Sequence, residues 1–158
     1  MGDVKTRVAV LGIGNPLCQD DGIGIFVVQQ MQGKEKYQGV DILDGGTSPD
    51  LFSLLDRDVT RLVIVDALHG DGKPGTIYRL PINESHISDE APVSLHGLGV
   101  LDSLKLMQKL GVQPPRVTII GVEPADVSYG LNLSPEIGAI VPDIIKTIED
   151  EILYREKM

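Results

Sequence analysis

Short apolar runs alternate along this chain of 158 residues with segments whose apolar residues recur every three or four positions. The runs are typical of buried strands, and the periodic segments are typical of amphipathic helices. The run "RLVIVDA" (61–67) is almost wholly apolar, which indicates a strand buried on both faces. This alternation is the pattern of βαβ units, and it predicts an α/β sandwich of three layers around a mostly parallel sheet.

The apolar runs predict a five-stranded sheet with helices on both faces. Only the short loop 69–75 separates the fourth strand from the third, so the fourth is expected to run antiparallel to it. The other strands are expected to be parallel. The strands are expected at 7–12, 40–46, 61–67, 76–80 and 116–124.

Four helices complete the predicted units. The second is expected to have Ser48 as its N-cap and Pro49 at its first helical position, where the missing N–H costs nothing. The last is expected to carry Glu149 and Glu151 opposite its apolar stripe. The stripes of the first, third and last helices are Ile23, Val27 and Met31 with Phe26 beside them; Leu98, Leu101, Leu104 and Met107; and Ile140, Ile144, Ile148 and Ile152.

The chain is acidic, with a formal net charge of -9 and an isoelectric point of about 4.7. Nucleic acids and anionic membranes offer no counter-charge to such a surface, so neither is an expected partner, whereas a metal cation is compatible with it. Cys18 is the single cysteine, which excludes an internal disulfide and indicates a reducing compartment. No stretch fits a signal peptide or a membrane span, so a cytoplasmic protein is expected. The length suits one domain over residues 1–158, which we expect to be monomeric.

The stretch "GIGNPLCQDDGIG" (12–24) follows directly on the first strand and raises the question of a phosphate site. A dinucleotide fingerprint has the form G-x-G-x-x-G, but Leu17 stands where the third glycine belongs. Two adjacent aspartates would also lie where a pyrophosphate sits. The glycines are therefore expected to serve a tight turn and, at Gly22 and Gly24, close packing of the first helix on the sheet.

Acidic residues come just after the expected strands. Ligands of open α/β sheets bind beyond the carboxyl ends of the strands, so these residues are expected to share one edge. An acidic edge with one histidine suits a divalent cation better than a phosphate. The candidates are Asp20, Asp21, Asp44, Asp66 and Glu123, together with His96 at the start of the third helix.

Each main candidate also has a structural interpretation. Of Asp20 and Asp21, one is expected to cap the first helix while the other faces the crevice. Asp66 is either a turn aspartate that bonds its own backbone or a functional group, because a carboxylate after a strand buried on both faces needs a partner. Asp44 is either a turn former or part of the cleft. His96 is either a structural histidine or a metal ligand through its neutral imidazole.

The other polar residues near this edge are assigned no chemical role. Glu123 is expected to be structural, and His69 lies in a loop. Cys18 is expected to be a small packed residue and not a nucleophile. Neither a G-x-S-x-G elbow nor a Cys–His pairing signal indicates a covalent nucleophile.

Five motifs occur in this order along the chain: "VLGIGNPLCQDDGIG", "DILDGGT", "LVIVDA", "SLHGLGVLDSL" and "IIGVEP". Together they resemble the maturation endopeptidases of nickel–iron hydrogenases, over nearly the whole chain up to "LSPEI" (133–137). The resemblance implies that the protein removes a short C-terminal extension from the hydrogenase large-subunit precursor, and only after nickel insertion. It also implies that nickel in the precursor meets three protease residues, which match Asp21, Asp66 and His96.

The sequence departs from the pattern of this family at two positions. The first acid is often Glu in the family, so Asp21 has a slightly different reach. Cys18 stands where Ser or Thr is expected, which adds a soft sulfur near the implied nickel site. Neither departure removes a ligand from the implied set.

Peptide hydrolysis needs an activated water and a stabilised oxyanion. The candidates for this chemistry are the carboxylates Asp21, Asp66 and Asp44, or a water on the metal. The family is often classed with aspartic peptidases, although the sequence shows no shared-proton dyad. Nickel is expected to arrive with the precursor, and no organic cofactor is expected. The alternative is a non-catalytic module that binds the nickel-loaded precursor as a checkpoint or chaperone.

Overall fold

The computed structural model describes residues 6–47, 49–82 and 95–154, and at its centre is a five-stranded sheet in the order β2-β1-β3-β5-β4. β1 pairs in parallel with β2 and β3, and β3 pairs in parallel with β5, whereas β4 and β5 are antiparallel. The predicted mostly parallel sheet with one antiparallel strand is confirmed. The strands are β1 (Arg7–Gly12), β2 (Asp41–Asp44), β3 (Val59–Ala67), β4 (Ile77–Ile82) and β5 (Arg116–Val122).

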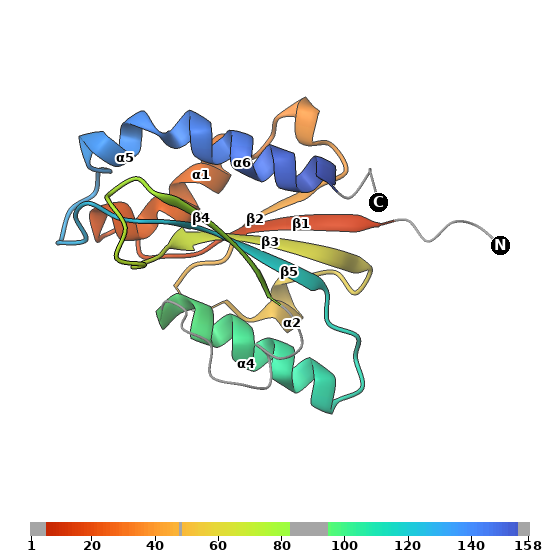
Figure 1. Ribbon diagram of the computed structural model, residues 1–158. Coiled ribbons are helices and arrows are strands. Elements are labelled where there is room, and N and C mark those ends of the chain that lie inside the picture. Colours follow the sequence, from red (N-terminus) through yellow and green to blue (C-terminus); the bar gives the residue numbers. More distant parts are fainter. Residues whose placement is uncertain (1–5, 48, 83–94, 155–158) are drawn as a thin grey trace.

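Helices cover both faces of this sheet (Figure 1). α1, α5 and α6 lie on one face, and α2 and α4 lie on the other, which confirms the three-layer sandwich. In the part of the chain that the structure describes, the helices are α1 (Ile23–Met31), α2 (Leu51–Leu54), α4 (Leu95–Lys109), α5 (Pro135–Ala139) and α6 (Val141–Tyr154), with short 3-10 turns η1 (Gln19–Gly22) and η2 (Glu35–Tyr37).

Alternation along the strands divides the core in two. In β1, Val8 and Val10 pack with α1 and α6, whereas Ala9 and Leu11 pack with α2 and α4. β3 is buried continuously from Arg61 onward, as expected of a central parallel strand. Each helical layer therefore buries an apolar stripe against its own face of the sheet, and this burial is the dominant favourable term in folding.

The fourth strand is antiparallel as predicted, but its partner is β5 and not β3. β3 already has β1 on one side and β5 on the other, so neither edge of β3 is open to β4. The connection from β3 crosses the end of β5, where Gly75 N–H donates to Glu123 O (2.8 Å). At the sheet edge, β4 tolerates Pro81, which has no N–H to donate.

The second helix begins later than predicted. α2 starts at Leu51, and its N-cap is Asp50, whose carboxylate accepts the N–H of Phe52 (3.0 Å). Pro49 therefore lies before the helix and not at its first position. The predicted cap, Ser48, lies outside the described residues. The sequence offers two capping residues within three positions, and the tertiary position of the helix selected the second.

The last helix is shorter than its apolar pattern predicted. α6 begins at Val141, and Ile140 instead closes the short helix α5. α5 has Ser134 as its N-cap and Pro135 at its first position, a favourable start for a helix that the prediction missed. Ile144 and Ile148 are fully buried, as their spacing predicted.

The burial of two helical side chains is the opposite of what was predicted. Phe26, placed beside the stripe of the first helix, is exposed. Glu151, placed on the solvent side of the last helix, is only 2% exposed. It accepts a hydrogen bond from the Thr118 hydroxyl (2.9 Å) and forms ion pairs with Arg61 and Arg79. Buried carboxylates require such partners, and these partners come from strands that the helical pattern cannot reveal.

A search of the described helices for a membrane span found no helix with the length and apolar character to cross a bilayer.

Candidate functional site

The carboxyl ends of β1, β2 and β3 end side by side and form the candidate site. Gly12, the last residue of β1, is in register with Asp44 on β2 and with Val65 on β3. Asp66 follows Val65 directly. The topology therefore places Asp44 and Asp66 on the two sides of the point where β1 ends, at the edge predicted from the order of the strands.

The glycine-rich loop that leaves β1 closes over this edge. Gly14 has a φ of 146°, and a Cβ there would lie 2.1 Å from the carbonyl oxygen of Asp21. A Cβ on Gly24 would lie 2.1 Å from the carbonyl oxygen of Val65. Any side chain at these two positions would displace the backbone. The predicted turn is confirmed, and so is the predicted close packing on the sheet at Gly24, whereas Gly22 packs against Pro16 of the loop itself. The loop sets Asp21 above the end of β1.

Neither adjacent aspartate caps the first helix, contrary to prediction. The turn η1 separates both from α1, whose N-cap is Gly22 with no side-chain hydrogen bond. Asp20 is fully buried and accepts hydrogen bonds from a distant segment that includes Ser134. Asp21 is partly exposed, and its Oδ2 accepts the N–H of Asn15 (3.0 Å). The predicted cap is therefore wrong, because the buried aspartate cross-links a distant segment. That the other aspartate faces the crevice stays a prediction.

Asp44 forms the backbone bond that its interpretation as a turn former requires, whereas Asp66 lies within β3 and bonds the N–H of the next residue, which is not a turn. Asp66 is 3% exposed, and its Oδ1 accepts the N–H of Ala67 (2.8 Å). Asp44 is exposed, and its Oδ1 accepts the N–H of Gly46 (2.9 Å), which ends β2 two residues before its predicted limit. Such a bond uses one carboxylate oxygen and is compatible with a second role for the other. A functional role for either aspartate stays a prediction.

His96 is the second residue of α4, as its place in the sequence predicted. Figure 1 shows the first turn of α4 at the end of the sheet where β1 and β3 terminate. The side chain of His96 lies outside the described residues, so its approach to Asp21 and Asp66 stays a prediction. Among the side chains that the structure does describe, no group of three His, Cys, Asp or Glu residues is arranged to hold a metal.

Glu123, at the end of β5, holds the loop between β3 and β4. Its Oε1 accepts the N–H of Gly70 (2.8 Å), the N–H of Gly72 (3.0 Å) and the hydroxyl of Tyr78 (2.7 Å). Burial would raise the pKa of Glu123, but the bonds from Tyr78 and the two amides outweigh burial and hold this pKa below its ordinary value. The loop residue His69 lies 3.8 Å from its other oxygen. These contacts agree with the structural role expected for Glu123.

Cys18 is half-buried, and the part of the chain that the structure describes gives its thiol no disulfide partner. Its backbone forms an isolated parallel bridge with Gly130. This bridge belongs to a contact between the loop after β1 and residues 125–134 that the sequence analysis did not find. The Ser-Pro pair at 134–135 could have indicated the start of a helix there, but no sequence signal indicates which loop the segment contacts.

The fold and this edge together define the class of protein: a three-layer α/β protein whose carboxylates gather at the carboxyl ends of its parallel strands. The family model of hydrogenase maturation proteases matches residues 25–151. The chain therefore belongs to the hydrogenase maturation protease family.

Individual relatives agree with this assignment. The chain is 31% identical to the hydrogenase 2 maturation protease of Escherichia coli over 148 residues, which cover 90% of this chain and 88% of the relative. It is 32% identical to the hydrogenase expression/formation protein HupD of Rhizobium leguminosarum over 144 residues, which cover 89% of this chain and 71% of the relative.

Solved structures show the same fold. The hydrogenase-maturating endopeptidase HybD of Escherichia coli superposes with a TM-score of 0.77 at 28% identity, covering 96% of this chain and 94% of that one. The [NiFe] hydrogenase maturation protease HybD of Thermococcus kodakarensis gives a TM-score of 0.75 at 28% identity, covering 92% and 98%. The likeness extends over both helical layers and the sheet edge, and not over the sheet alone.

The metal-ligand set implied by the family resemblance, Asp21, Asp66 and His96, stays a prediction. Two carboxylates and one imidazole would together suit a divalent transition metal such as nickel. Three protein donors would leave coordination positions open, as in catalytic metal sites.

Proposed function

We propose that this protein is an endopeptidase that removes the C-terminal extension of the nickel-loaded large-subunit precursor of a nickel–iron hydrogenase. The observation that supports this proposal most directly is the placement of Asp44 and Asp66 on either side of the end of β1, with Asp21 above it. The membership of the chain in the hydrogenase maturation protease family supplies the substrate class. The acidic charge and the single cysteine favour a monomer that acts in the cytoplasm.

Recognition of the substrate depends on its metal. Nickel belongs to the precursor, and Asp21, Asp66 and His96 donate to its open positions. A precursor without nickel offers this acidic edge no cation, and three like-charged carboxylates at one edge disfavour docking in its absence. Nickel thus acts as the signal that the precursor is ready to be cut.

The bond cleavage needs a base for the attacking water, and we propose Asp44 for this role. Its carboxylate is exposed, and Gly46 N–H occupies only Oδ1, which orients the group without burying it. General-base catalysis of this kind contributes on the order of 100-fold to 10,000-fold in rate. Asp21 and Asp66, held by main-chain N–H groups, complete the acidic surface against which the scissile bond lies.

The central experiment incubates the purified chain with nickel-loaded and with nickel-free precursor and reads both by intact mass. We expect a loss of mass at the C-terminus of the nickel-loaded precursor alone. Equal cleavage of both forms would contradict nickel-dependent recognition. Binding of the loaded precursor without any cleavage would identify the protein as a checkpoint that grips its partner.

The variant Asp44→Asn distinguishes a turn-forming role of Asp44 from a role as the general base. Asparagine forms the same turn with Gly46 N–H but cannot act as a base. We expect precursor cleavage to fall about 100-fold or more while the thermal midpoint stays close to that of the wild type. Asp50→Asn is the matched control, because Asp50 makes a similar bond to Phe52 N–H away from this edge. If Asp44→Asn cleaves at the wild-type rate, Asp44 only forms the turn.

A further inference from the structure

Asp20 is a fully buried carboxylate to which the proposed chemistry gives no part. Its Oδ2 accepts the N–H of Ala125 (2.9 Å), the N–H of Asp126 (3.0 Å) and the hydroxyl of Ser134 (2.7 Å). Its Oδ1 accepts the N–H of Ser134 (2.8 Å). All these donors belong to the segment 125–134, more than 100 residues along the chain. Asp20 is therefore a cross-link between that segment and the loop after β1.

Main-chain bonds extend this cross-link on both sides of Asp20. The N–H of Asp20 donates to the carbonyl of Asp126 (3.0 Å), and the N–H of Gln19 donates to the carbonyl of Gly130 (3.0 Å). The N–H of Gly130 returns a bond to the carbonyl of Leu17 (2.8 Å). A Cβ on Gly130 would lie 2.9 Å from Cγ of Gln19, so Gly130 packs closely against the Gln19 side chain.

Asp21 is thus held from two directions. On one side its carbonyl oxygen lies against Gly14, and its Oδ2 accepts the N–H of Asn15 (3.0 Å). On the other side it follows Asp20 directly in the turn η1. The backbone of Asp21 cannot shift unless one of these two contacts yields.

We propose that Asp20 is a positioning residue: by pinning the segment 125–134 to the turn η1, its buried carboxylate sets the place of Asp21. This inference rests on the proposed function for its effect on cleavage, but its structural part stands alone. Polar groups that orient a metal-ligating or catalytic side chain matter nearly as much as the side chain itself.

Asparagine in place of Asp20 keeps the volume but not the bonding. An amide has one oxygen and one NH₂ group, whereas both oxygens of Asp20 accept hydrogen bonds. The NH₂ would face a main-chain N–H, which leaves a buried donor without an acceptor. The turn η1 must move to relieve this contact. A displacement of about 1 Å of a group that acts on the substrate lowers the rate on the order of 100-fold.

Ser134→Ala offers a milder form of the same change. It removes one donor to Asp20 but leaves the carboxylate and its three main-chain donors in place. It also removes the N-cap of α5, whose bond to Ile137 N–H is long (3.4 Å). If Asp20→Asn fails to fold, Ser134→Ala can therefore test the same positioning role of Asp20.

Asp126→Asn is the matched control. Asp126 lies on the same segment, and the substitution removes the same charge. Its exposed side chain bonds to the N–H (2.9 Å) and hydroxyl (2.6 Å) of Ser128 within the segment, and it also bonds to the Gln19 side chain, a bond that the oxygen of asparagine can keep. Its main-chain bonds with Asp20 do not depend on its side chain.

The experiment records the ¹⁵N–¹H amide signal of Asn15 in the full chain, since this N–H donates to the Asp21 carboxylate. Asp21→Ala, which has no side-chain acceptor, serves as the reference for the lost bond. We expect the signal to move toward this reference in Asp20→Asn, to move less in Ser134→Ala, and to stay in place in Asp126→Asn. In cleavage of nickel-loaded precursor, we expect kcat/KM to fall about 10-fold to 100-fold in Asp20→Asn, with a raised KM because Asp21 is a proposed ligand of the nickel in the precursor.

The outcomes separate this inference from the proposed function. An Asn15 signal that stays at its wild-type position in both Asp20→Asn and Ser134→Ala overturns the positioning role, whatever the rate of cleavage. A shift of equal size in Asp126→Asn overturns it too, because any change in the segment would then suffice. If the signal moves as expected but the wild-type chain cleaves no precursor, the positioning role stands and the proposed function fails.

Discussion

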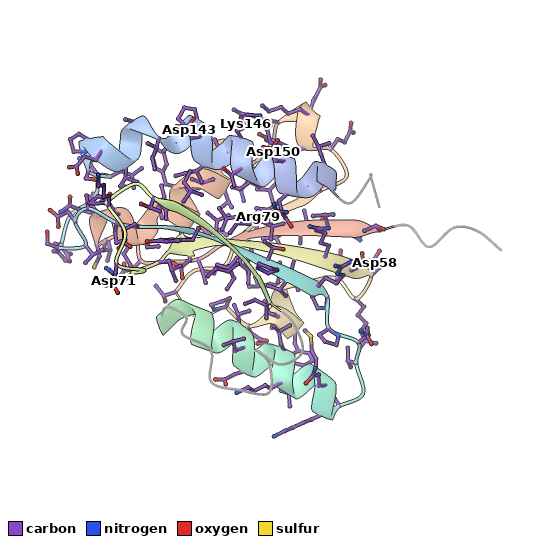
Figure 2. All side chains as sticks on the ribbon, viewed as in Figure 1. Asp58, Asp71, Arg79, Asp143, Lys146 and Asp150 are labelled. Carbon is purple, nitrogen blue, oxygen red and sulfur yellow. The ribbon has the colours of Figure 1, made fainter. Side chains whose placement is uncertain are left out.

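Carboxylates at the two ends of the sheet have different partners. At the amino end, marked by Asp58 in Figure 2, carboxylates pair with arginines. Arg7 lies 3.0 Å from Asp41 and 3.0 Å from Asp58. The hydrogen bonds that Arg7 donates to these two aspartates, and their negative charge, hold the pKa of Arg7 above its ordinary value. Farther into the structure, Glu151 forms ion pairs with both Arg61 and Arg79.

At the carboxyl end, marked by Asp71 in Figure 2, carboxylates accept main-chain N–H groups and hydroxyls. Asp20, Asp21 and Asp44 each bond at least one backbone amide. Glu123 bonds two amides and one tyrosine hydroxyl. A main-chain amide orients a carboxylate with a dipole, whereas a guanidinium cancels its full charge.

This difference separates acids whose charge is cancelled by an arginine from acids that keep their charge. Ion pairs at the amino end satisfy the carboxylates and stabilise the fold. Hydrogen bonds from main-chain N–H groups at the carboxyl end hold the carboxylates in place without cancelling their negative charge. The same residue type therefore has two uses in one protein, and the partner decides which.

The largest effect on stability is expected from Glu151→Gln. Glutamine keeps the shape and the contact with the Thr118 hydroxyl but leaves the Arg61 guanidinium buried without its counter-charge. Breaking a buried ion pair in this way costs about 3–5 kcal/mol. Urea unfolding measures the loss of unfolding free energy. A loss below about 1 kcal/mol would show that this pair behaves like a surface pair and would remove the contrast between the two ends.

Asp66→Asn is expected to have a large effect on the rate of cleavage and a smaller effect on the free energy of unfolding. Asparagine can still accept the N–H of Ala67 but no longer offers a charged oxygen to a metal. Loss of a proposed nickel ligand should lower cleavage of nickel-loaded precursor by about 100-fold or more, since even the partners of such ligands account for about 10-fold to 100-fold. Intact mass over time gives the rate. Cleavage at the wild-type rate would contradict a functional role for Asp66.

Glu123→Gln tests the amide-bound type of carboxylate through pH. The folded pKa of Glu123 lies below its ordinary value of 4.5, so the folded state binds this proton less readily than the unfolded state. The contribution of Glu123 to the free energy of unfolding is therefore fully present above pH 4.5. It is lost as the pH falls through the folded pKa. We expect the wild type to lose more unfolding free energy than Glu123→Gln between about pH 6 and about pH 3. If urea unfolding shows the same loss of unfolding free energy with falling pH in the wild type and in Glu123→Gln, Glu123 contributes nothing to acid sensitivity.

The smallest effect is expected from the exposed pair on the outer side of α6. Lys146 lies 3.6 Å from Asp150, one turn along the helix, and both project into solvent (Figure 2). Exposed pairs of this spacing contribute about 0.3–0.5 kcal/mol, which salt screens further. Lys146→Gln should therefore lower unfolding free energy by no more than this amount. Because Glu151 lies on the same helix, the two variants together measure what burial adds to an ion pair.

Much of the site could be predicted from the sequence because its acids are local to strand ends. Asp44 and Asp66 each follow a recognisable apolar run, and parallel strands bring such positions to one edge. Asp21 follows a glycine turn whose two constraints, at Gly14 and Gly24, are visible in the sequence and confirmed by the close backbone contacts. The cross-link through Asp20 was missed because its donors lie more than 100 residues away.

By itself, the sequence determined the three layers, the parallel sheet with one reversed strand, and the edge where the acids gather. Periodicity records which side of an element is apolar, and that information is local to each element. Only the tertiary structure decided that β4 pairs with β5, that Glu151 is buried, and that Asp20 is a buried cross-link. The physical reason is the same in each case: a polar side chain takes its role from the partner opposite it, and these partners come from segments remote in the chain.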